Sequence, residues 1–149
     1  METVAIIMWS LWYFRNLALW KNNALGLWSP APAGTFKCDV DSASFAYQQR
    51  TSFVVIVWND QRQFVKAFSG SYPVLLCPRL VEVFSVREAL SWLKSEGYSH
   101  VILEGDCMEV FTVLCTALPN LSEFGVLLDD CHRLHTHFQF YFLLGSTNS

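Results

Sequence analysis

The sequence lacks the motifs on which several common enzyme classes depend. It has no C-x-x-C pair, no glycine-rich phosphate loop and no Ser–His–Asp order. Redox proteins and hydrolases that need those motifs are therefore without support. The sequence also contains no internal repeat and no low-complexity tract.

Positive charge is scarce as well. Ten Lys and Arg residues against thirteen Asp and Glu residues give a net charge of −3, whereas proteins that bind nucleic acid usually present a basic face. This balance argues against tight binding to a phosphate backbone, although a bound metal ion would offset the acidic residues locally. No basic cluster typical of a nuclear-localisation signal is visible among these residues.

Long hydrophobic runs are missing too. Residues Met1–Asn23 are rich in apolar and aromatic side chains, but their uninterrupted apolar stretch is too short to cross a bilayer. A signal peptide would start with basic residues and end in a small-residue cleavage site, whereas this stretch starts with Glu2 and ends near Trp20 and Lys21. We therefore expect a protein that is not secreted and has no membrane partner.

Three interpretations of this aromatic N-terminal segment stay open. We favour a helix that packs on the domain or on a segment upstream of it. The second interpretation is an interfacial or partner-binding helix. The third is a membrane anchor formed by Met1–Trp20, which cell fractionation with and without those residues would test.

The five cysteines are odd in number and lie inside apolar runs. They are Cys38, Cys77, Cys107, Cys115 and Cys131. We interpret all five as buried thiols of a protein in a reducing compartment.

The composition is that of a folded domain. Of the 149 residues, 52% are apolar and 15% are aromatic, which is enough for a real core and excludes a solvated disordered chain. Two prolines and a glycine within Leu27–Gly34 break any helix or central strand there. We therefore expect a lead-in over residues 1–26, one domain over residues 27–144 and a disordered tail over residues 145–149.

Hydrophobic periodicity predicts an α/β fold. The expected strands are residues 37–41, 51–58, 62–69, 101–103 and 138–144, and the expected helices are residues 80–96, 108–118 and 124–134. Three consecutive strands joined by short turns form an antiparallel meander. The strand at 101–103 follows a helix and is therefore expected to run parallel to the first strand. The result is a mixed sheet of five strands, three in a meander plus two more, flanked by helices.

Three acidic residues end up close together in this layout. Alternation puts Lys37, Asp39 and Asp41 on one face of the first strand, with Asp41 where we expect the strand to end. Glu82 opens the helix over 80–96, and Asp106 closes the strand at 101–103. A strand end, a helix start and a second strand end can bring three carboxylates to one point, where they would hold a hard divalent cation. Each acid also has a simpler explanation, as a solvated strand end, a first-turn helix charge and a helix cap respectively.

The order of these motifs resembles a known family. Trp28–Ala43 is similar to the pattern W-x-P-P-x-G-x-x-K-x-N-x-D-G/A-A, and Trp58–Phe64 is similar to R-D-x-x-G-x-F. Val81–Leu93 is similar to A-E-x-x-A-x-x-x-A-L-x-W, although Val81 stands where the pattern has alanine. Leu103–Asp106 is similar to v-E-x-D, and Leu11–Asn16 resembles a W-x-x-R-N lead-in. These patterns are typical of the ribonuclease H-like domains that are abundant in plant genomes and related to non-LTR retrotransposons.

This resemblance implies an endonuclease that cuts the RNA strand of an RNA–DNA hybrid. With that chemistry it implies a nuclear or cytoplasmic location. It implies that Asp41, Glu82 and Asp106 are the catalytic ligands of two Mg²⁺ ions. A catalytically inactive nucleic-acid-binding or vestigial module, derived from a retrotransposon, is the alternative. Nothing in Gly145–Ser149 matches the family's closing segment, so we expect the final helix to be missing. Ser42 stands where the family has glycine or alanine, and Asp39 stands where it usually has asparagine.

Other polar residues receive simpler interpretations. Asp39 and Glu104 are expected to be solvated or to support the site. The pair Asp129 and Asp130 is interpreted as a solvated helix end. The histidines at 132, 135 and 137 have spacing that could ligate zinc, but no cysteine pair or acidic partner completes such a site, so surface or half-buried histidines are expected.

Overall fold

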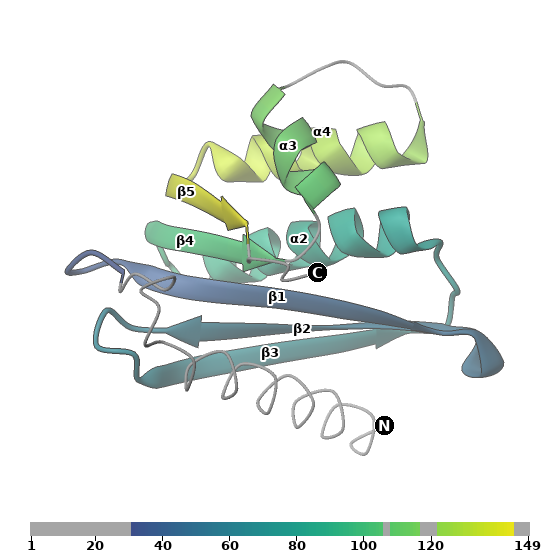
Figure 1. Cartoon of the computed structure of the whole chain (residues 1–149), viewed down its shortest axis with the longest axis horizontal. Coiled ribbons are helices and arrows are strands. Elements are labelled where there is room, and N and C mark those ends of the chain that lie inside the picture. Colours follow the sequence, from purple (N-terminus) through teal and green to yellow (C-terminus); the bar gives the residue numbers. More distant parts are fainter. Residues whose placement is uncertain (1–30, 106–107, 117–121, 145–149) are drawn as a thin grey trace.

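The computed structural model describes residues 31–105, 108–116 and 122–144 and contains one five-stranded sheet (Figure 1). The strands are β1 (Phe36–Phe45), β2 (Arg50–Trp58), β3 (Phe64–Tyr72), β4 (His100–Gly105) and β5 (Gln139–Leu144). The helices are the 3₁₀ turn η2 (Ala46–Gln48), α2 (Pro78–Ser95), α3 (Met108–Thr116) and α4 (Glu123–His135). The predicted lead-in over residues 1–26 and tail over residues 145–149 lie outside the described residues.

The sheet is mixed, with strand order β3-β2-β1-β4-β5. β1, β2 and β3 form an antiparallel meander, β4 pairs with β1 in parallel, and β5 pairs with β4 in parallel. A parallel neighbour requires a crossover connection, and α2 supplies the one between the meander and β4. The predicted α/β fold with three meander strands plus two more is confirmed.

The helices α2, α3 and α4 lie on one side of the sheet (Figure 1). α2 packs directly on it, and its stripe of Val83, Val86, Leu90 and Leu93 is buried in the main core, as the helical spacing predicted. α4 packs on α2 from the far side. The core therefore lies between the sheet and α2 and continues between α2 and α4. No helix among the described residues is long and apolar enough to cross a membrane.

β2 is buried on both faces. Phe53, Val55 and Val57 belong to the main core, whereas Val54 and Ile56 belong with Trp58 to a second buried cluster. A strand that is buried on both sides reads in sequence as a continuous apolar run. This explains why residues 51–58 show no alternation of apolar and polar side chains.

β1 is longer than the sequence indicated. Asp41 does not end the strand, because pairing with β2 continues as far as Phe45 opposite Arg50. The turn is confined to η2 and Gln49, which adopts a left-handed conformation with φ 49°. Residues 42–44 were predicted to lie beyond the end of this strand. Their pairing with β2 outweighs the weak strand propensity of serine and alanine.

The start of α2 also differs from the prediction. The helix begins at Pro78, a residue favoured in the first turn because it needs no amide donor there. Glu82 therefore lies in the second turn, and its interpretation as a first-turn charge is wrong. The end of α2 was predicted correctly, since Gly97 with φ 82° follows the helix.

Only part of the cysteine prediction is confirmed. Cys38 and Cys131 are free and buried, whereas Cys77 is free and exposed. Cys77 lies in the loop that leads into α2, at the N-cap position, so the apolar residues before it do not enclose its thiol. The side chains of Cys107 and Cys115 lie outside the described part of the structure.

Candidate active site

The structure brings together two of the three predicted acids, Asp41 and Glu82. Ser42 lies between them. Its backbone N–H donates to Asp41 Oδ1 at 2.9 Å, and its hydroxyl donates to Glu82 Oε1 at 2.9 Å. Ser42 thus bonds to its neighbour in the strand and to a residue 40 positions away in the sequence.

The packing of α2 on β1 explains this proximity. Cys38 and Val40 of β1 and Val83 of α2 are all buried in the main core, which fixes the early turns of the helix against the strand. Val81 and Val83 are buried on either side of Glu82 in the sequence. Glu82 itself, like Asp41, is only half-buried, so both carboxylates lie where a solvated ion can reach them.

Asp106, the third predicted acid, lies outside the described residues, and its role stays a prediction. Its nearest described neighbour is Gly105, the last residue of β4. β1 and β4 run parallel, with Cys38 opposite Leu103 and Asp39 opposite Glu104. Within the described part of the chain, no three His, Cys, Asp or Glu residues lie close enough to hold a metal ion.

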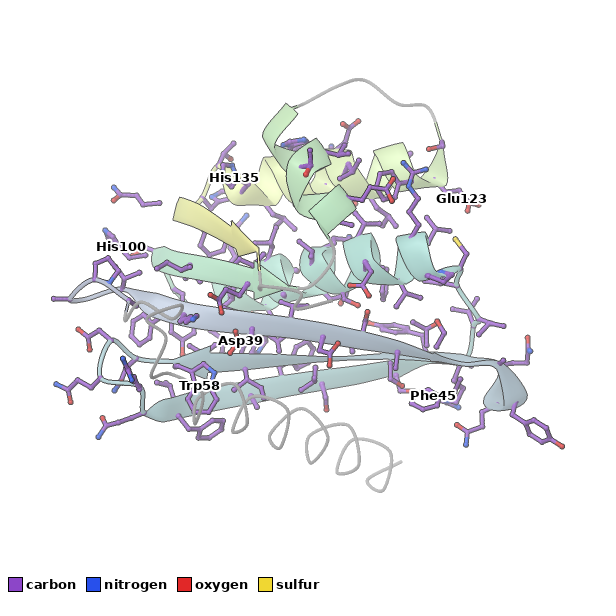
Figure 2. All side chains as sticks on the ribbon, in the orientation of Figure 1. Asp39, Phe45, Trp58, His100, Glu123 and His135 are labelled. Carbon is purple, nitrogen blue, oxygen red and sulfur yellow. The ribbon has the colours of Figure 1, made fainter. Side chains whose placement is uncertain are left out.

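A second pair of carboxylates is formed by Asp39, two residues before Asp41 on β1, and Glu104 of β4. Asp39 is opposite Glu104, and Lys37 Nζ lies 2.8 Å from Glu104 Oε2. Trp58 Nε1 donates to Asp39 Oδ2 at 2.7 Å, and both side chains are labelled in Figure 2, on neighbouring strands. The side chain of Lys37 is only 4% exposed and that of Glu104 is 20% exposed. The expectation that Asp39 and Glu104 are solvated is therefore wrong, and a supporting role is the interpretation that remains.

Burial determines the protonation of Asp39. Burial first, and then the negative charge of Glu104, raise the pKa of Asp39 to about 8, although Lys37 and the Trp58 N–H act in the opposite direction. At neutral pH its carboxyl group is therefore mostly protonated. A protonated carboxyl group can both donate and accept hydrogen bonds, as an asparagine amide does, and asparagine is the residue that the resembling family usually has here.

Sequence reasoning missed two features of this region. The first is the hydroxyl of Ser42, whose only signal was a departure from the glycine or alanine of the family pattern. The second is the burial of Lys37. Its alternation with Asp39 was visible in the sequence, but the carboxylate that pairs with it comes from β4, which only the sheet register reveals.

The simpler interpretations hold for the three histidines and for Asp129, but not for Asp130. The three histidines at the end of α4 and beyond are half-buried or exposed: His132, His135 and His137. Asp129 is exposed, whereas Asp130 forms ion pairs with Arg87 and Arg133. Asp130 thereby connects α4 to α2, so it is not simply a solvated helix end.

Comparisons with known proteins agree on one fold. The chain has the fold of RNase H1 from Halobacterium salinarum, with a TM-score of 0.67 and 16% identity over 76% of this chain and 87% of that one. LC11-RNase H1, solved in complex with an RNA/DNA hybrid, has a TM-score of 0.65 and 8% identity over 76% and 86% of the two chains. The N-terminal RNase H domain of a Mycobacterium tuberculosis protein has a TM-score of 0.62 and 11% identity over 76% and 85%.

The family is identified from the sequence. A search of the curated proteins gave no match. The pattern of the reverse transcriptase-like family, however, matches residues 38–143, which include Asp41, Glu82 and Asp106. The chain therefore belongs to the reverse transcriptase-like family and has a ribonuclease H-like domain.

Proposed function

We propose that this domain is a Mg²⁺-dependent ribonuclease that hydrolyses the RNA strand of an RNA–DNA hybrid. The observation that carries the proposal is the convergence of Asp41 and Glu82 on Ser42 in a chain of this family. One protein of similar fold, LC11-RNase H1, was solved with an RNA/DNA hybrid, which supports the choice of substrate.

The donor set fits a hard divalent cation. Asp41 and Glu82 offer carboxylate oxygens in a half-buried position, and Mg²⁺ prefers such ligands while keeping several of its waters. Asp106 would complete the set from the chain that follows β4. When bound, a pair of such ions activates the attacking water and stabilises the oxygen that leaves the phosphate.

The residues of the chain must bind the cations and accept the hybrid. Asp41 and Glu82 would bind the cations, because they lie close together on two elements that the core fixes relative to each other. The surrounding surface must accept a hybrid although the net charge of the chain is −3. Recognition by groove shape and by the 2′-hydroxyl demands few sequence-specific contacts, and bound cations would offset the local negative charge.

A cleavage assay with matched variants tests this function. The full chain is incubated with a labelled RNA–DNA hybrid over a range of Mg²⁺ concentrations. Asp41→Asn should lower the cleavage rate about a thousandfold or more, because metal catalysis lowers the activation barrier by several kcal/mol. Asp129→Asn removes one carboxylate from an exposed position on α4 and should leave the rate unchanged.

The assay also separates the enzyme from a catalytically inactive module. Binding of the hybrid without cleavage, in folded protein with Mg²⁺ present, would contradict the catalytic proposal and favour a nucleic-acid-binding role. Cleavage that persists in Asp41→Asn would show that the activity does not come from this site. Cleavage of single-stranded RNA at the same rate would contradict the assignment of a hybrid as substrate.

A further inference from the structure

Ser42 contacts both candidate metal ligands through two different donors. Its backbone N–H holds a carboxylate oxygen of its own strand, and its hydroxyl holds one from α2, each at 2.9 Å. Both bonds are partly buried. A hydrogen bond to a carboxylate is stronger in such a place than in bulk water.

The hydroxyl of Ser42 orients the carboxylate of Glu82, whose side-chain rotations the helix does not restrict. Buried Val81 and Val83 hold the backbone of α2, but several rotatable bonds separate that backbone from the carboxylate. Ser42 limits these rotations by binding Oε1. A side chain that is already ordered loses less conformational freedom when it binds a metal ion.

Ser42 does this without using up the acceptors. A carboxylate has about four lone-pair sites on its two oxygens. Ser42 binds Oε1 of Glu82 and Oδ1 of Asp41, so each carboxylate keeps a second oxygen that Ser42 does not bond. The two donors also reduce the repulsion between neighbouring negative charges, because each presents a partial positive charge to one of them.

We propose that Ser42 is a positioning residue of the metal site, which holds Glu82 beside Asp41 and thereby increases the affinity of the site for Mg²⁺. The inference rests on the proposed function, since it requires that Asp41 and Glu82 bind the ion. Groups that hydrogen-bond to metal ligands typically change metal affinity about 10-fold to 100-fold.

The test measures Mg²⁺ binding to the full chain by isothermal titration calorimetry, without any substrate. Ser42→Ala removes the hydroxyl and keeps the backbone N–H, and it should weaken Mg²⁺ binding about tenfold. Ser42→Thr keeps the hydroxyl on a residue suited to a strand and should bind within about twofold of the native protein. Ser44→Ala is the matched control, because Ser44 lies two residues along the same strand and donates to Leu76 O at 3.2 Å. It should leave the affinity unchanged.

Three results would overturn the inference. Ser42→Ala that binds Mg²⁺ as tightly as the native chain would show that the hydroxyl does not position Glu82, and the proposed function would stand. Equal weakening in Ser44→Ala would point to a general effect on β1. No Mg²⁺ binding by the native chain would overturn the proposed function together with this inference. If urea unfolding shows that Ser42→Ala does not fold, Ser42→Gly replaces it, since glycine also keeps the N–H and lacks the hydroxyl.

Discussion

Asp39 and Asp41 lie two residues apart on β1, and each is paired with a glutamate from another element. Different groups bind the two pairs of carboxylates. Asp39 and Glu104 sit beside the buried cation of Lys37 and the N–H of Trp58. Asp41 and Glu82 are bridged by the neutral donors of Ser42, which leave the formal charge of both carboxylates unchanged. Lys37 compensates the negative charge of the first pair, so that pair has a structural role. Ser42 adds no positive charge to the second pair, so that pair is suited to bind a cation from solution.

The pH dependence of stability should separate the pairs most clearly. The pKa of Asp39 is raised in the folded state from its ordinary value of 3.8 to about 8, so the native protein binds a proton that the unfolded chain releases. Its contribution to stability is therefore present below about pH 4 and decreases as pH rises toward 8, by at most about 1.4 kcal/mol per pH unit. Asp39→Asn should flatten this slope.

Urea unfolding between pH 4 and pH 8 in the presence of EDTA measures the effect. The metal chelator matters because a bound cation would change the charge beside Asp39. The charged groups that face Asp39 are Glu104 and Lys37, and both stay in place in Asp39→Asn. Parallel stability curves for the native protein and this variant would contradict the raised pKa.

Removal of the buried cation should cost the most stability at a single pH. Lys37→Met leaves Glu104 facing Asp39 without its ion-pair partner, and we expect a loss of about 3 kcal/mol in the free energy of unfolding. Lys66→Met is the control. Lys66 pairs with Glu96, but its side chain is 50% exposed, so its loss should cost less than about 1 kcal/mol. Equal losses in the two variants would show that burial of Lys37 does not matter.

The contrast between Lys37 and Lys66 shows where sequence reasoning ends. The meander, the stripe of α2 and the parallel strand could be predicted because local periodicity determines them. Alternation also placed Lys37 and Asp39 on one face, yet nothing in the sequence indicated that Lys37 would be buried. Its carboxylate partner is Glu104, which lies far away in the sequence and meets β1 only through the register of β1 and β4.

The candidate site shows the same limit. Asp41 and Glu82 were found as acids in a family pattern, and in the structure both accept a hydrogen bond from Ser42. The length of β1 was predicted wrongly because pairing with β2 overrides the weak strand propensity of residues 42–44. For the same reason Ser42 was not expected within the sheet, where its hydroxyl reaches Glu82.

Mg²⁺ should stabilise the second pair of carboxylates and not the first. A ligand at a hundredfold excess over its dissociation constant adds about 2.7 kcal/mol to the free energy of unfolding. We expect this gain in the native protein and in Asp39→Asn, and we expect Asp41→Asn to lose it. Urea unfolding with and without Mg²⁺ at pH 7 is the measurement. A Mg²⁺ effect that disappears in Asp39→Asn alone would place the ion at the first pair.

The smallest effect should come from the indole that binds Asp39. Trp58→Phe removes the N–H that donates to Asp39 Oδ2 at 2.7 Å and keeps an aromatic ring, so we expect a loss of about 1 kcal/mol in the free energy of unfolding at pH 7. The loss should grow as pH rises from 7 through about 8, where Asp39 ionises. The hydrogen bond lowers the pKa of Asp39, so it favours the ionised carboxylate more than the protonated carboxyl group. Trp92→Phe is the control, because Trp92 stacks on Phe68 and is not bonded to Asp39. A loss of the same size in both variants, independent of pH, would show that the indole ring acts through packing and not through its hydrogen bond to the carboxylate.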